Sequence, residues 1–501
     1  MRFAEWKNYL LPETLGSTVT PEPIWKPIHH FSHIQPPPCN PHFLYSHDLQ
    51  KFLHGKQLLI EEIPFTIEEL QLHYMNGYIS YRIPIRKERS RLTCLRCGNN
   101  DTNLFASFSC AKCNEQCNYC RKCITMGRIS ECTPLISWTG PTEAYIVHPP
   151  ILAWNGKLSG GQQEAANEVA HAVTNHHELL IWAVCGAGKT EVLFQGIETA
   201  ILAKKQVCIA TPRTDVVIEL APRLKAAFPT IDVIALYGGS EDRNKTAQLV
   251  IATTHQLLRF YQAFDVIIID EVDAFPYSAE PMLEYAVTQA KKQISTTVLL
   301  TATPNKTMQK QVLIGKRKAV TIPARYHRQP LPVPEFKWCG NWQKKLMKNT
   351  LPANVLHWIT THLHSNKQAF LFVPYIEGLN QIVDLLKIID KRIEGVHSED
   401  PKRKEKVALF RSGEIPLLVT TTILERGVTV PNIDVAVLGA ESQIFTESAL
   451  VQISGRVGRS PKFPSGEILF FHYGKTNAML AAKRQISRMN KEAIRKGLID
   501  A

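Results

Sequence analysis

The chain has 501 residues, of which 44% are hydrophobic and 21% charged, the balance of an ordinary soluble protein with about three domains. Lysine and arginine outnumber aspartate and glutamate by 58 to 45, and the resulting charge of +13 favours polyanionic partners. The first residues carry no secretion signal, and no apolar run approaches the roughly 18 residues of a membrane span. We therefore expect a cytoplasmic protein, at most peripheral at the inner face of the cell membrane.

Residues 1–90 are rich in proline and aromatic residues, which argues against a long helix. Apolar and polar residues alternate from Tyr74 to Ile85, so we predict a strand or hairpin there. The role of this region stays open between an adaptor and a cover over the domains that follow.

The next stretch concentrates eight of the twelve cysteines of the chain. They are Cys94, Cys97, Cys110, Cys113, Cys117, Cys120, Cys123 and Cys132. Two residues between paired cysteines allow both thiolates to reach one tetrahedral ion, and an intracellular chain keeps its thiols reduced. We therefore predict structural Zn²⁺, one or two ions per chain. Either two sites form, or one site uses Cys94, Cys97, Cys120 and Cys123 while the other thiols are spare or form a weaker second site.

Basic residues surround two aromatic residues in the same stretch. The basic set is Arg91, Arg96, Lys112, Arg121, Lys122 and Arg128, and the aromatic residues are Phe108 and Tyr119. This mixture suits phosphate contacts and base stacking, and it equally suits a solvated surface. The sequence does not choose between them.

From residue 151 onward, apolar runs alternate with helical stretches, the pattern of parallel α/β layers. The apolar run Leu179–Val184 leads into a glycine-rich loop with Gly186, Gly188, Lys189 and Thr190. Backbone N–H groups of such a loop converge on phosphate oxygens, while the lysine neutralises the terminal phosphates and the threonine hydroxyl holds Mg²⁺. The sequence thus predicts a phosphate-binding loop between a strand and a helix.

The runs 207–210, 250–252 and 266–269 are predicted as further buried strands. The last of them ends in Asp270 and Glu271. Carboxylates at the carboxyl end of a parallel strand lie where ligands bind in such sheets. Asp270 is expected to hold Mg²⁺, and Glu271 to orient and deprotonate an attacking water.

A second α/β series begins after the proline-dense stretch 322–334, which we interpret as an interlobe connection. The runs 370–373 and 417–420 are predicted as its strands. Arg456 and Arg459 lie three residues apart, close to one helical turn, so both guanidinium groups can face one cleft. If this cleft holds the terminal phosphate, the two residues act as arginine fingers.

The C-terminal run is predicted as an amphipathic helix. Arg484, Arg488, Lys491 and Arg495 fall on one face, and Ile486, Met489 and Ala493 on another. A solvated face, a DNA track and a docking surface are all compatible with this pattern.

Four motifs in order, the loop at 183–190, Asp270–Asp273, Thr301–Thr303 and Gln452–Arg459, resemble the motif set of superfamily 2 helicases. With the cysteine cluster and its Cys120-Arg-Lys-Cys-Ile-Thr-Met-Gly127 run, the chain resembles the ComFA family of late-competence DNA-uptake ATPases from Gram-positive bacteria. The resemblance implies two tandem RecA-like lobes with ATP and Mg²⁺ between them.

The resemblance also implies roles for individual residues. Gln162 would read the adenine edge, and Thr301 and Thr303 would couple hydrolysis to lobe movement. Short hydroxyl side chains and one arginine suit phosphates without reading bases. The implied contacts to the nucleic-acid backbone are Thr211, Arg213, Thr253, Thr254 and Thr421.

We therefore expect four segments: 1–90 of unknown role, 91–150 as a zinc module, 151–327 as the first lobe and 328–501 as the second. The expected function is ATP-dependent translocation of single-stranded DNA during the uptake of transforming DNA. ComFC and the membrane channel ComEC are the partners that the resemblance implies. The alternatives are a PriA-like replication-restart helicase, whose zinc module interrupts its motor region, and a zinc-dependent DNA-binding scaffold with a nucleotide-controlled conformation.

Overall fold

The computed structural model is an α/β protein whose described residues are 1–7, 9–16, 23–31, 37–89, 91–143, 145–365 and 367–499. The chain forms two compact units. Unit 1 contains Met1–Asn155, Ala170–Glu178 and Phe194–Leu299, and unit 2 contains Gly156–Val169, Leu179–Leu193 and Leu300–Ala501.

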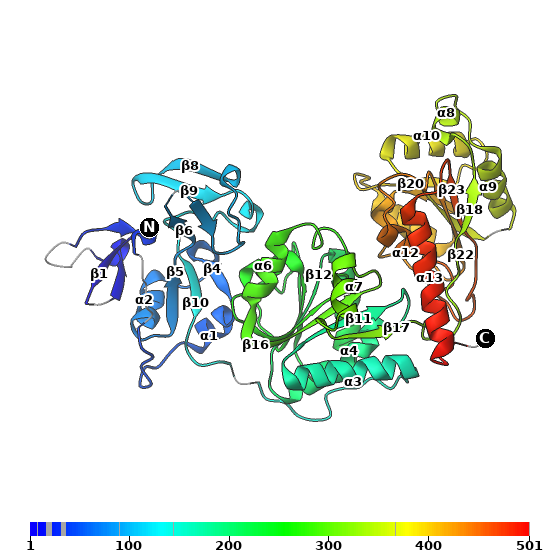
Figure 1. The fold of residues 1–501 in the computed structure, drawn as a ribbon. Coiled ribbons are helices and arrows are strands. Elements are labelled where there is room, and N and C mark those ends of the chain that lie inside the picture. Colours follow the sequence, from blue (N-terminus) through cyan, green and yellow to red (C-terminus); the bar gives the residue numbers. More distant parts are fainter. Residues whose placement is uncertain are drawn as a thin grey trace. The chain divides into compact units, whose positions relative to one another are not determined.

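The first part of unit 1 is built from small antiparallel sheets and short helices (Figure 1). Its elements are β1 (Arg2–Trp6), β2 (Tyr9–Pro12), β3 (Lys26–Pro27), α1 (His47–Leu53), β4 (Gln57–Leu59), α2 (Ile67–Met75), β5 (Ile79–Arg82), β6 (Ile85–Glu88), β7 (Arg91–Cys94), β8 (Phe105–Cys110), β9 (Glu115–Cys120) and β10 (Leu135–Trp138). The sheets have the orders β2-β1-β3 and β4-β10-β5, and β6-β7 and β8-β9 form hairpins. Because β10 pairs with two strands that precede the hairpins, the cysteine-rich segment is an insertion in this fold.

The strand or hairpin predicted from Tyr74 to Ile85 is only partly correct. Tyr74 lies in the last turn of α2, and the strands that follow, β5 and β6, belong to different sheets. The helix forms because Thr66 caps its start by accepting a hydrogen bond from Glu69 N at 3.2 Å. Leu70 and Tyr74, one turn apart, are both buried, so helical periodicity outweighs the local alternation.

The described residues contain a parallel sheet of seven strands in the order β13-β14-β12-β15-β16-β11-β17. The strands are β11 (Glu178–Ala183), β12 (Val207–Thr211), β13 (Val233–Leu236), β14 (Leu249–Thr253), β15 (Phe264–Ile269), β16 (Lys291–Thr301) and β17 (Ala319–Ile322). The predicted strands at 207–210, 250–252 and 266–269 are confirmed in β12, β14 and β15. Nearly every residue of these strands is buried, which explains why each reads as an unbroken apolar run.

Within its described residues, unit 2 holds a second parallel sheet of six strands in the order β18-β23-β22-β19-β21-β20. The strands are β18 (Glu335–Trp338), β19 (Gln368–Phe372), β20 (Glu394–Val396), β21 (Leu417–Thr420), β22 (Ile433–Leu438) and β23 (Ile468–His472). The predicted runs at 370–373 and 417–420 correspond to β19 and β21. The two parallel sheets confirm the predicted fold of two RecA-like lobes.

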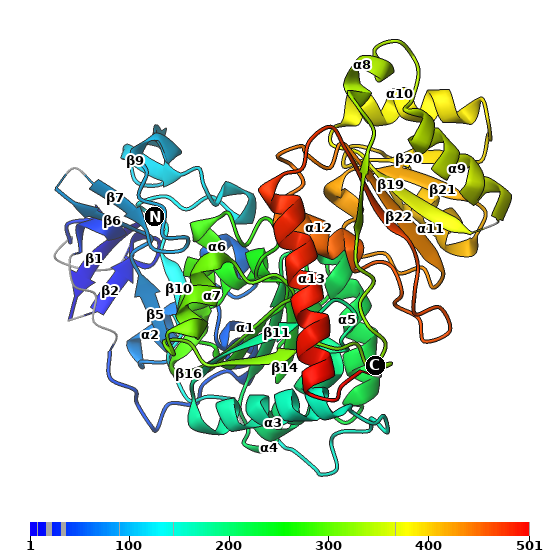
Figure 2. The same cartoon turned by 45° about the vertical axis from the view of Figure 1, so that its right-hand side comes forward.

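Helices accompany both parallel sheets (Figures 1 and 2). They are α3 (Gly160–Asn175), α4 (Lys189–Leu202), α5 (Thr214–Ala227), α6 (Pro281–Ala290), α7 (Lys306–Leu313), α8 (Trp342–Leu346), α9 (Ala353–Ser365), α10 (Ile376–Lys387), α11 (Arg403–Ser412), α12 (Glu447–Ser454) and α13 (Asn477–Arg495). None of the described helices is long and apolar enough to cross a membrane.

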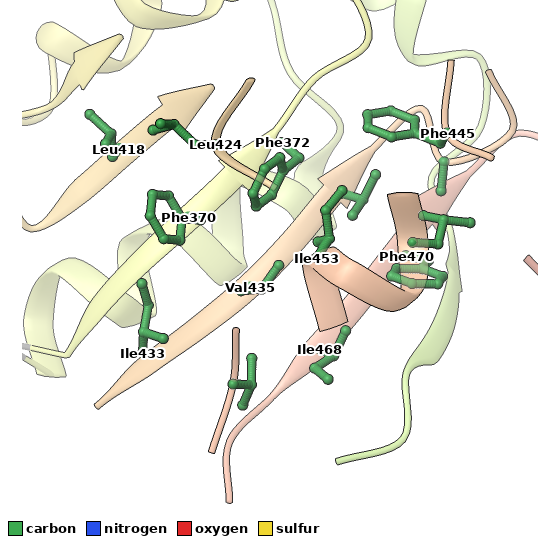
Figure 3. Close-up of a cluster of buried hydrophobic side chains, with 14 of the residues drawn as sticks. Phe370, Phe372, Leu418, Leu424, Ile433, Val435, Phe445, Ile453, Ile468 and Phe470 are labelled. Atoms are coloured by element: carbon green, nitrogen blue, oxygen red, sulfur yellow. The ribbon is translucent and has the colours of Figure 1, made fainter. Parts of the chain in front are cut away.

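The second sheet is buried on both faces by separate apolar clusters. Figure 3 shows one of them, in which Phe370, Val435 and Phe470 from the strands meet Ile453 from α12. Helix α13 adds Ile486 and other apolar residues to this cluster, which confirms the predicted amphipathic C-terminal helix. The carboxyl ends of parallel strands lie at one edge of a sheet, and several predicted site residues, among them Thr211, Asp270 and Thr421, are found there.

Candidate nucleotide site and cysteine clusters

The glycine-rich loop joins β11 to α4 in unit 2. Gly186 and Gly188 have φ angles of +80° and +71°, a region that side chains with a Cβ rarely occupy. Helix α4 begins at Lys189, so Lys189 and Thr190 stand at a helix N-terminus with its unpaired N–H groups. This backbone has the form that the sequence predicts for a phosphate cradle.

The side chain of Gln162 contacts this loop. Its side chain is buried, its Oε1 accepts a hydrogen bond from Ser159 N at 2.8 Å, and its Nε2 donates to Ala187 O at 2.9 Å. A Cβ on Gly188 would lie only 2.4 Å from the same Nε2, so a larger residue there would displace the Gln162 amide in addition to straining the backbone. Adenine recognition by Gln162 remains a prediction, because both ends of its amide contact protein in this structure.

Arg456 and Arg459 lie beyond the helix that their spacing predicts, because α12 ends at Ser454. The buried Arg456 donates from Nε to Glu425 O at 3.1 Å and from Nη1 to Val428 O. Arg459 donates from Nε to the backbone carbonyl of residue 455 at 2.8 Å. Both arginines are thus held by backbone, and their role as arginine fingers stays a prediction.

A third arginine, which no sequence motif marks, joins the loop to the segment of Arg456. Arg325 is 1% exposed, and its Nε donates to Cys185 O at 3.1 Å. Its Nη1 donates to Gly458 O, and its Nη2 lies 3.4 Å from Gly455 O. Burial, with a contribution from Arg459, lowers the pKa of Arg325 to about 10, which leaves it charged at neutral pH.

The loop also contacts α12 through a side chain. Cys185 Sγ donates to Gln452 Oε1 at 3.1 Å, and a Cβ on Gly455 would lie 2.4 Å from Cys185 Cβ. The glycine in the Gln452–Arg459 motif therefore allows the phosphate loop and this motif to approach closely. The loop and the arginine-bearing segment form one packed site in unit 2.

Thr301 and Thr303 lie at the end of β16 and beyond it. Thr301 Oγ1 accepts a hydrogen bond from Thr303 N at 2.9 Å, and Thr303 Oγ1 lies 2.8 Å from Ser448 Oγ on α12. The carbonyl of residue 302 accepts hydrogen bonds from Trp182 Nε1 at 3.1 Å and from Gln485 Nε2 at 2.8 Å. This segment therefore contacts β11, α12 and α13, which suits the coupling role that remains its prediction.

Asp270 and Glu271 follow β15 in unit 1, as predicted. Asp270 N donates to the carbonyl of residue 210 in β12 at 2.8 Å, and Asp270 Oδ1 accepts from Glu271 N at 2.9 Å. Glu271 has a φ of +55°, the left-handed region that is uncommon outside glycine. Such backbone strain is often found at functional sites, and both side chains are half-buried rather than solvated.

The predicted nucleic-acid contacts of unit 1 share the same sheet edge, because Thr211 and Thr253 are register partners at the ends of β12 and β14. The hydroxyls of Thr211 and Thr254 are buried, and neither has a hydrogen-bond partner among the described residues, which is uncommon in proteins. Arg213 is held by Asp215, with Nη2 2.6 Å from Oδ2. In unit 2, Thr421 directly follows β21 and is half-buried. DNA contact by all five residues remains a prediction.

The structure brings the eight cysteines together as two interleaved clusters of buried free thiols. One contains Cys94, Cys97, Cys120 and Cys123, and the other contains Cys110, Cys113, Cys117 and Cys132. The first set is the one named in the sequence-based prediction. The second joins a thiol near the end of the segment to the β8–β9 hairpin, a pairing that spacing alone leaves open.

The geometry of both clusters fits Zn²⁺. Sulfur–sulfur distances are 3.9 Å for Cys94–Cys123, 3.7 Å for Cys97–Cys120 and 3.6 Å for Cys110–Cys132. A tetrahedral ion with Zn–S bonds of about 2.3 Å places its ligands about 3.8 Å apart. A hydrogen bond from Cys117 lowers the pKa of Cys132, the direction that favours the thiolate form a zinc ion binds.

Some of the basic residues near Phe108 make contacts within the protein. Arg96 is buried and donates to Cys123 O at 2.7 Å and Met126 O at 2.8 Å, which orders the loop around the first cluster. Lys112 pairs with Glu61, and the guanidinium of Arg128 lies 4.6 Å from the Phe108 ring. These contacts favour a structural role over phosphate binding for Arg96 and Lys112.

The N-terminal region of unit 1 packs against segments beside the parallel sheet in the same unit, around residues 243 and 259–261. Glu62 pairs with Arg259 at 2.7 Å and with Arg243 at 3.0 Å. Gln57 Nε2 donates to Phe260 O at 3.1 Å, and the guanidinium of Arg82 lies 3.5 Å from the ring of the next residue, Tyr261. These contacts show that residues 57–82 pack on residues 243–261, and the choice between an adaptor and a cover for residues 1–90 stays open.

Three family models match successive parts of the chain. Competence protein ComFA N-terminal domain matches residues 40–137, DEAD/DEAH box helicase matches 160–311, and Helicase conserved C-terminal domain matches 350–461. The chain is 51% identical to competence protein ComFA of Bacillus subtilis over 449 residues, 90% of this chain and 96% of that protein. It is 38% identical to competence protein ComFA of Streptococcus pneumoniae over 438 residues, 87% of this chain and 97% of that protein. Among solved structures, S. cerevisiae Dbp5 bound to RNA and ADP BeF3 is 18% identical, covers 69% of this chain and 94% of its own, and has a TM-score of 0.48.

Proposed function

Because the chain belongs to the ComFA family of competence proteins, we propose that it is an ATP-driven translocase that moves single-stranded DNA during DNA uptake. Its helicase domains make it an ATP-binding protein of the superfamily 2 helicase type. The observation that carries the finer proposal is the phosphate loop, with positive φ at Gly186 and Gly188, packed through Cys185 against the motif that bears Arg456 and Arg459.

When bound, ATP and Mg²⁺ supply the reacting phosphoryl group and much of the charge that offsets its oxygens. Lys189 and the N–H groups at the start of α4 would hold the terminal phosphates, and Asp270 would hold the metal ion. Glu271 orients the attacking water and accepts its proton. Arg456 and Arg459 stabilise the charge that develops on the phosphate oxygens.

The proposed movement uses the contacts around the phosphate loop. The Cys185–Gln452 and Thr303–Ser448 hydrogen bonds connect the first-lobe motifs to α12. Hydrolysis at the phosphates alters these contacts. The predicted DNA-contacting threonines at the ends of the two parallel sheets then bind and release DNA in turn. The net result is directed movement along a single strand.

ATP turnover with and without single-stranded DNA is the first measurement. DNA should stimulate turnover, and Lys189→Ala should abolish it, whereas the exposed Lys204→Ala should not change it. DNA-stimulated turnover that survives Lys189→Ala would contradict the proposal. Binding of ATP without any turnover would instead indicate a nucleotide-switched scaffold.

Glu271→Gln tests the assigned base. The variant should bind ATP normally and hydrolyse it roughly 10²-fold more slowly or worse, because only proton transfer is lost. The matched control is Glu241→Gln at an exposed position. Loss of ATP binding in Glu271→Gln would mean that Glu271 binds the nucleotide rather than acting as the base.

The family relationship extends the proposal to partners. We propose that ComFC binds the protein and that single strands are drawn through the membrane channel ComEC. Co-purification of each partner with the tagged full chain checks this step. No binding to either partner would restrict the proposal to the translocase activity.

A further inference from the structure

Two large aromatic side chains lie side by side on the surface of unit 2. Trp338, the last residue of the edge strand β18, is 59% exposed, and Tyr473, which follows β23, is 50% exposed. Their ring centroids are 5.3 Å apart, with a 41° angle between the ring planes. Single exposed aromatics are ordinary, but an adjacent pair on a carboxyl sheet edge is a feature of ligand-binding surfaces.

The pair is held from beneath by buried groups. The Trp338 ring lies 5.9 Å from the ring of His472, which is 4% exposed. Tyr473 N donates to Glu441 Oε2 at 3.2 Å, and Glu441 Oε1 accepts from the buried Trp342 at 2.9 Å. The platform is therefore ordered by its own contacts, so little freedom is lost when a ring stacks on it.

A basic surface continues from this platform along α13. Lys475 and Lys483 place their Nζ atoms 5.9 Å and 5.1 Å from the ring of Phe336, two residues before Trp338. A shallow groove of about 480 Å³ then follows α13. Its described lining consists of Leu480, Lys483, Arg484, Ser487, Arg488 and Lys491, without a carboxylate. Lys483 lies over Phe336, which is on the same face of β18 as Trp338, and it also lines the groove, so the groove begins beside the platform.

The neighbouring acidic groups do not cancel this charge. Glu335 is paired with Lys337 at 2.9 Å, and Glu441 is engaged beneath the platform. Figure 2 shows α13, in red, as one long helix whose start lies near α12. Arg484, Arg488 and Lys491 of the groove are exposed, and Lys483 is half-buried.

We propose that Trp338, Tyr473 and the basic face of α13 form a further binding track for single-stranded DNA; this rests on the proposed function. Bases stack on the two rings, and Lys483, Arg484, Arg488 and Lys491 neutralise the phosphates. Aromatic faces beside a cationic groove are the chemistry that binds single strands without reading their sequence. Paired bases of a duplex cannot stack on such rings, so the track prefers a single strand.

A lipid surface is the other anionic partner that fits cations and aromatic rings. An interfacial helix inserts a free apolar face into the membrane. In α13 that face is already used, because Met479, Ala482, Ile486 and Met489 are buried in the protein. The buried apolar face therefore favours DNA.

The track adjoins the coupling segment. Gln485, on the buried side of α13, donates to the carbonyl of residue 302, and the guanidinium of Arg488 lies 4.7 Å from the Trp182 ring in β11. Helix α13 would therefore lie between DNA bound on its exposed side and the segment that contains Thr301 and Thr303. Occupancy of the track is expected to raise the DNA stimulation of ATP turnover.

The test measures the affinity of the full-length protein for fluorescent oligothymidylate at several salt concentrations. The double variant Trp338→Ala with Tyr473→Ala should weaken binding about tenfold. Trp338→Phe should keep most of the wild-type affinity, because a ring is enough for stacking. Arg484→Gln combined with Lys491→Gln should reduce the slope of log affinity against log salt by about two. Phe463→Ala and Lys404→Gln, at exposed positions away from the track, should change neither quantity.

The outcomes separate this inference from the function on which it rests. Tight binding by the wild type that is unchanged in both double variants overturns the track and leaves the translocase proposal intact. No binding of oligothymidylate by the wild type overturns both. Loss of binding to phosphatidylserine vesicles in the double variants, with DNA affinity unchanged, would reassign the surface to a membrane. Thermal unfolding of each variant confirms that the fold is retained.

Discussion

The cysteine hairpins and the second parallel sheet hold their strands together by different means. Around the second cysteine cluster, the buried core consists of four thiols with Phe108 packed beside them. The six-stranded sheet is covered by two apolar clusters that include Phe370, Phe470 and Trp358. A hairpin of this size buries too little apolar surface to be stable alone, so we expect a bound ion to supply what side-chain burial supplies in the sheet. Stability should therefore depend on the metal in one region and on packing in the other.

Removal of thiol ligands should give the largest effect. Cys94→Ser should lower bound zinc from about two ions per chain to about one, because the second cluster uses four other cysteines. Structural zinc contributes on the order of 10 kcal/mol, so the strands around the lost site should unfold locally. Elemental analysis and hydrogen exchange measure the two results.

Cys110→Ser should remove the other ion, and the exposed Cys39→Ser should remove neither. If Cys94→Ser released both ions, the two-cluster arrangement would be incorrect. Exchange in β19 and β22 should stay slow in all three variants, because Cys39, Cys94 and Cys110 belong to unit 1 and that sheet belongs to unit 2.

A core truncation in the sheet should have the opposite pattern. Phe470 is 0% exposed and lies 6.0 Å from the ring of Phe336. Phe470→Ala should lower the free energy of unfolding by about 3–5 kcal/mol, because a large cavity replaces the ring. Leu313→Ala, at an 85% exposed position, is the control. Zinc content should stay constant, and a loss of zinc in Phe470→Ala would show that the two regions are not independent.

Arg325→Met tests the hydrogen bonds of a buried arginine in unit 2, whose second sheet is held mainly by apolar packing. The substitution keeps much of the side-chain volume but removes the hydrogen bonds that Arg325 donates to the carbonyls of Cys185 and Gly458. We expect a loss of about 2–3 kcal/mol in the free energy of unfolding, and a weaker ATP affinity because the phosphate loop loses a contact. Calorimetric titration with ATP checks the second effect. Equal ATP affinity in the variant would restrict Arg325 to a purely structural role.

The sequence reveals features whose physical cause is local. Residues 267–269 read as a strand because both faces of β15 are buried, and Gly186 and Gly188 mark the loop because their φ angles exclude other residues. The cysteine spacing likewise predicts metal ligands, since two thiolates must reach one ion.

Features set by tertiary contacts leave a weaker signal. The partners of Arg325 and Gln485 are backbone carbonyls, which every residue carries, so no spacing pattern marks these contacts. The pairing of Cys132 with the β8–β9 hairpin depends on how the chain returns after that hairpin. Apolar and polar residues alternate from Tyr74 onward, which predicts a strand. The helix cap at Thr66, which explains why Tyr74 is helical, lies outside that stretch.

Acid should destabilise the packed part of unit 1 and the cysteine clusters of unit 1 by different mechanisms. The buried His54 allows the two effects to be measured separately. Burial, with a contribution from Lys292, lowers the pKa of His54 to about 4, and Lys56 acts in the same direction while Asp265 opposes it. The unfolded chain has a histidine pKa of about 6.5, so it takes up the proton first as pH falls, and stability is lost between about pH 6.5 and pH 4. The loss should reach about 2 kcal/mol at pH 5. His54→Gln should remove this pH dependence above pH 5, while acid release of zinc from the thiols should be unchanged. If zinc release shifted together with His54→Gln, the packed and the metal-held parts of unit 1 would unfold as one.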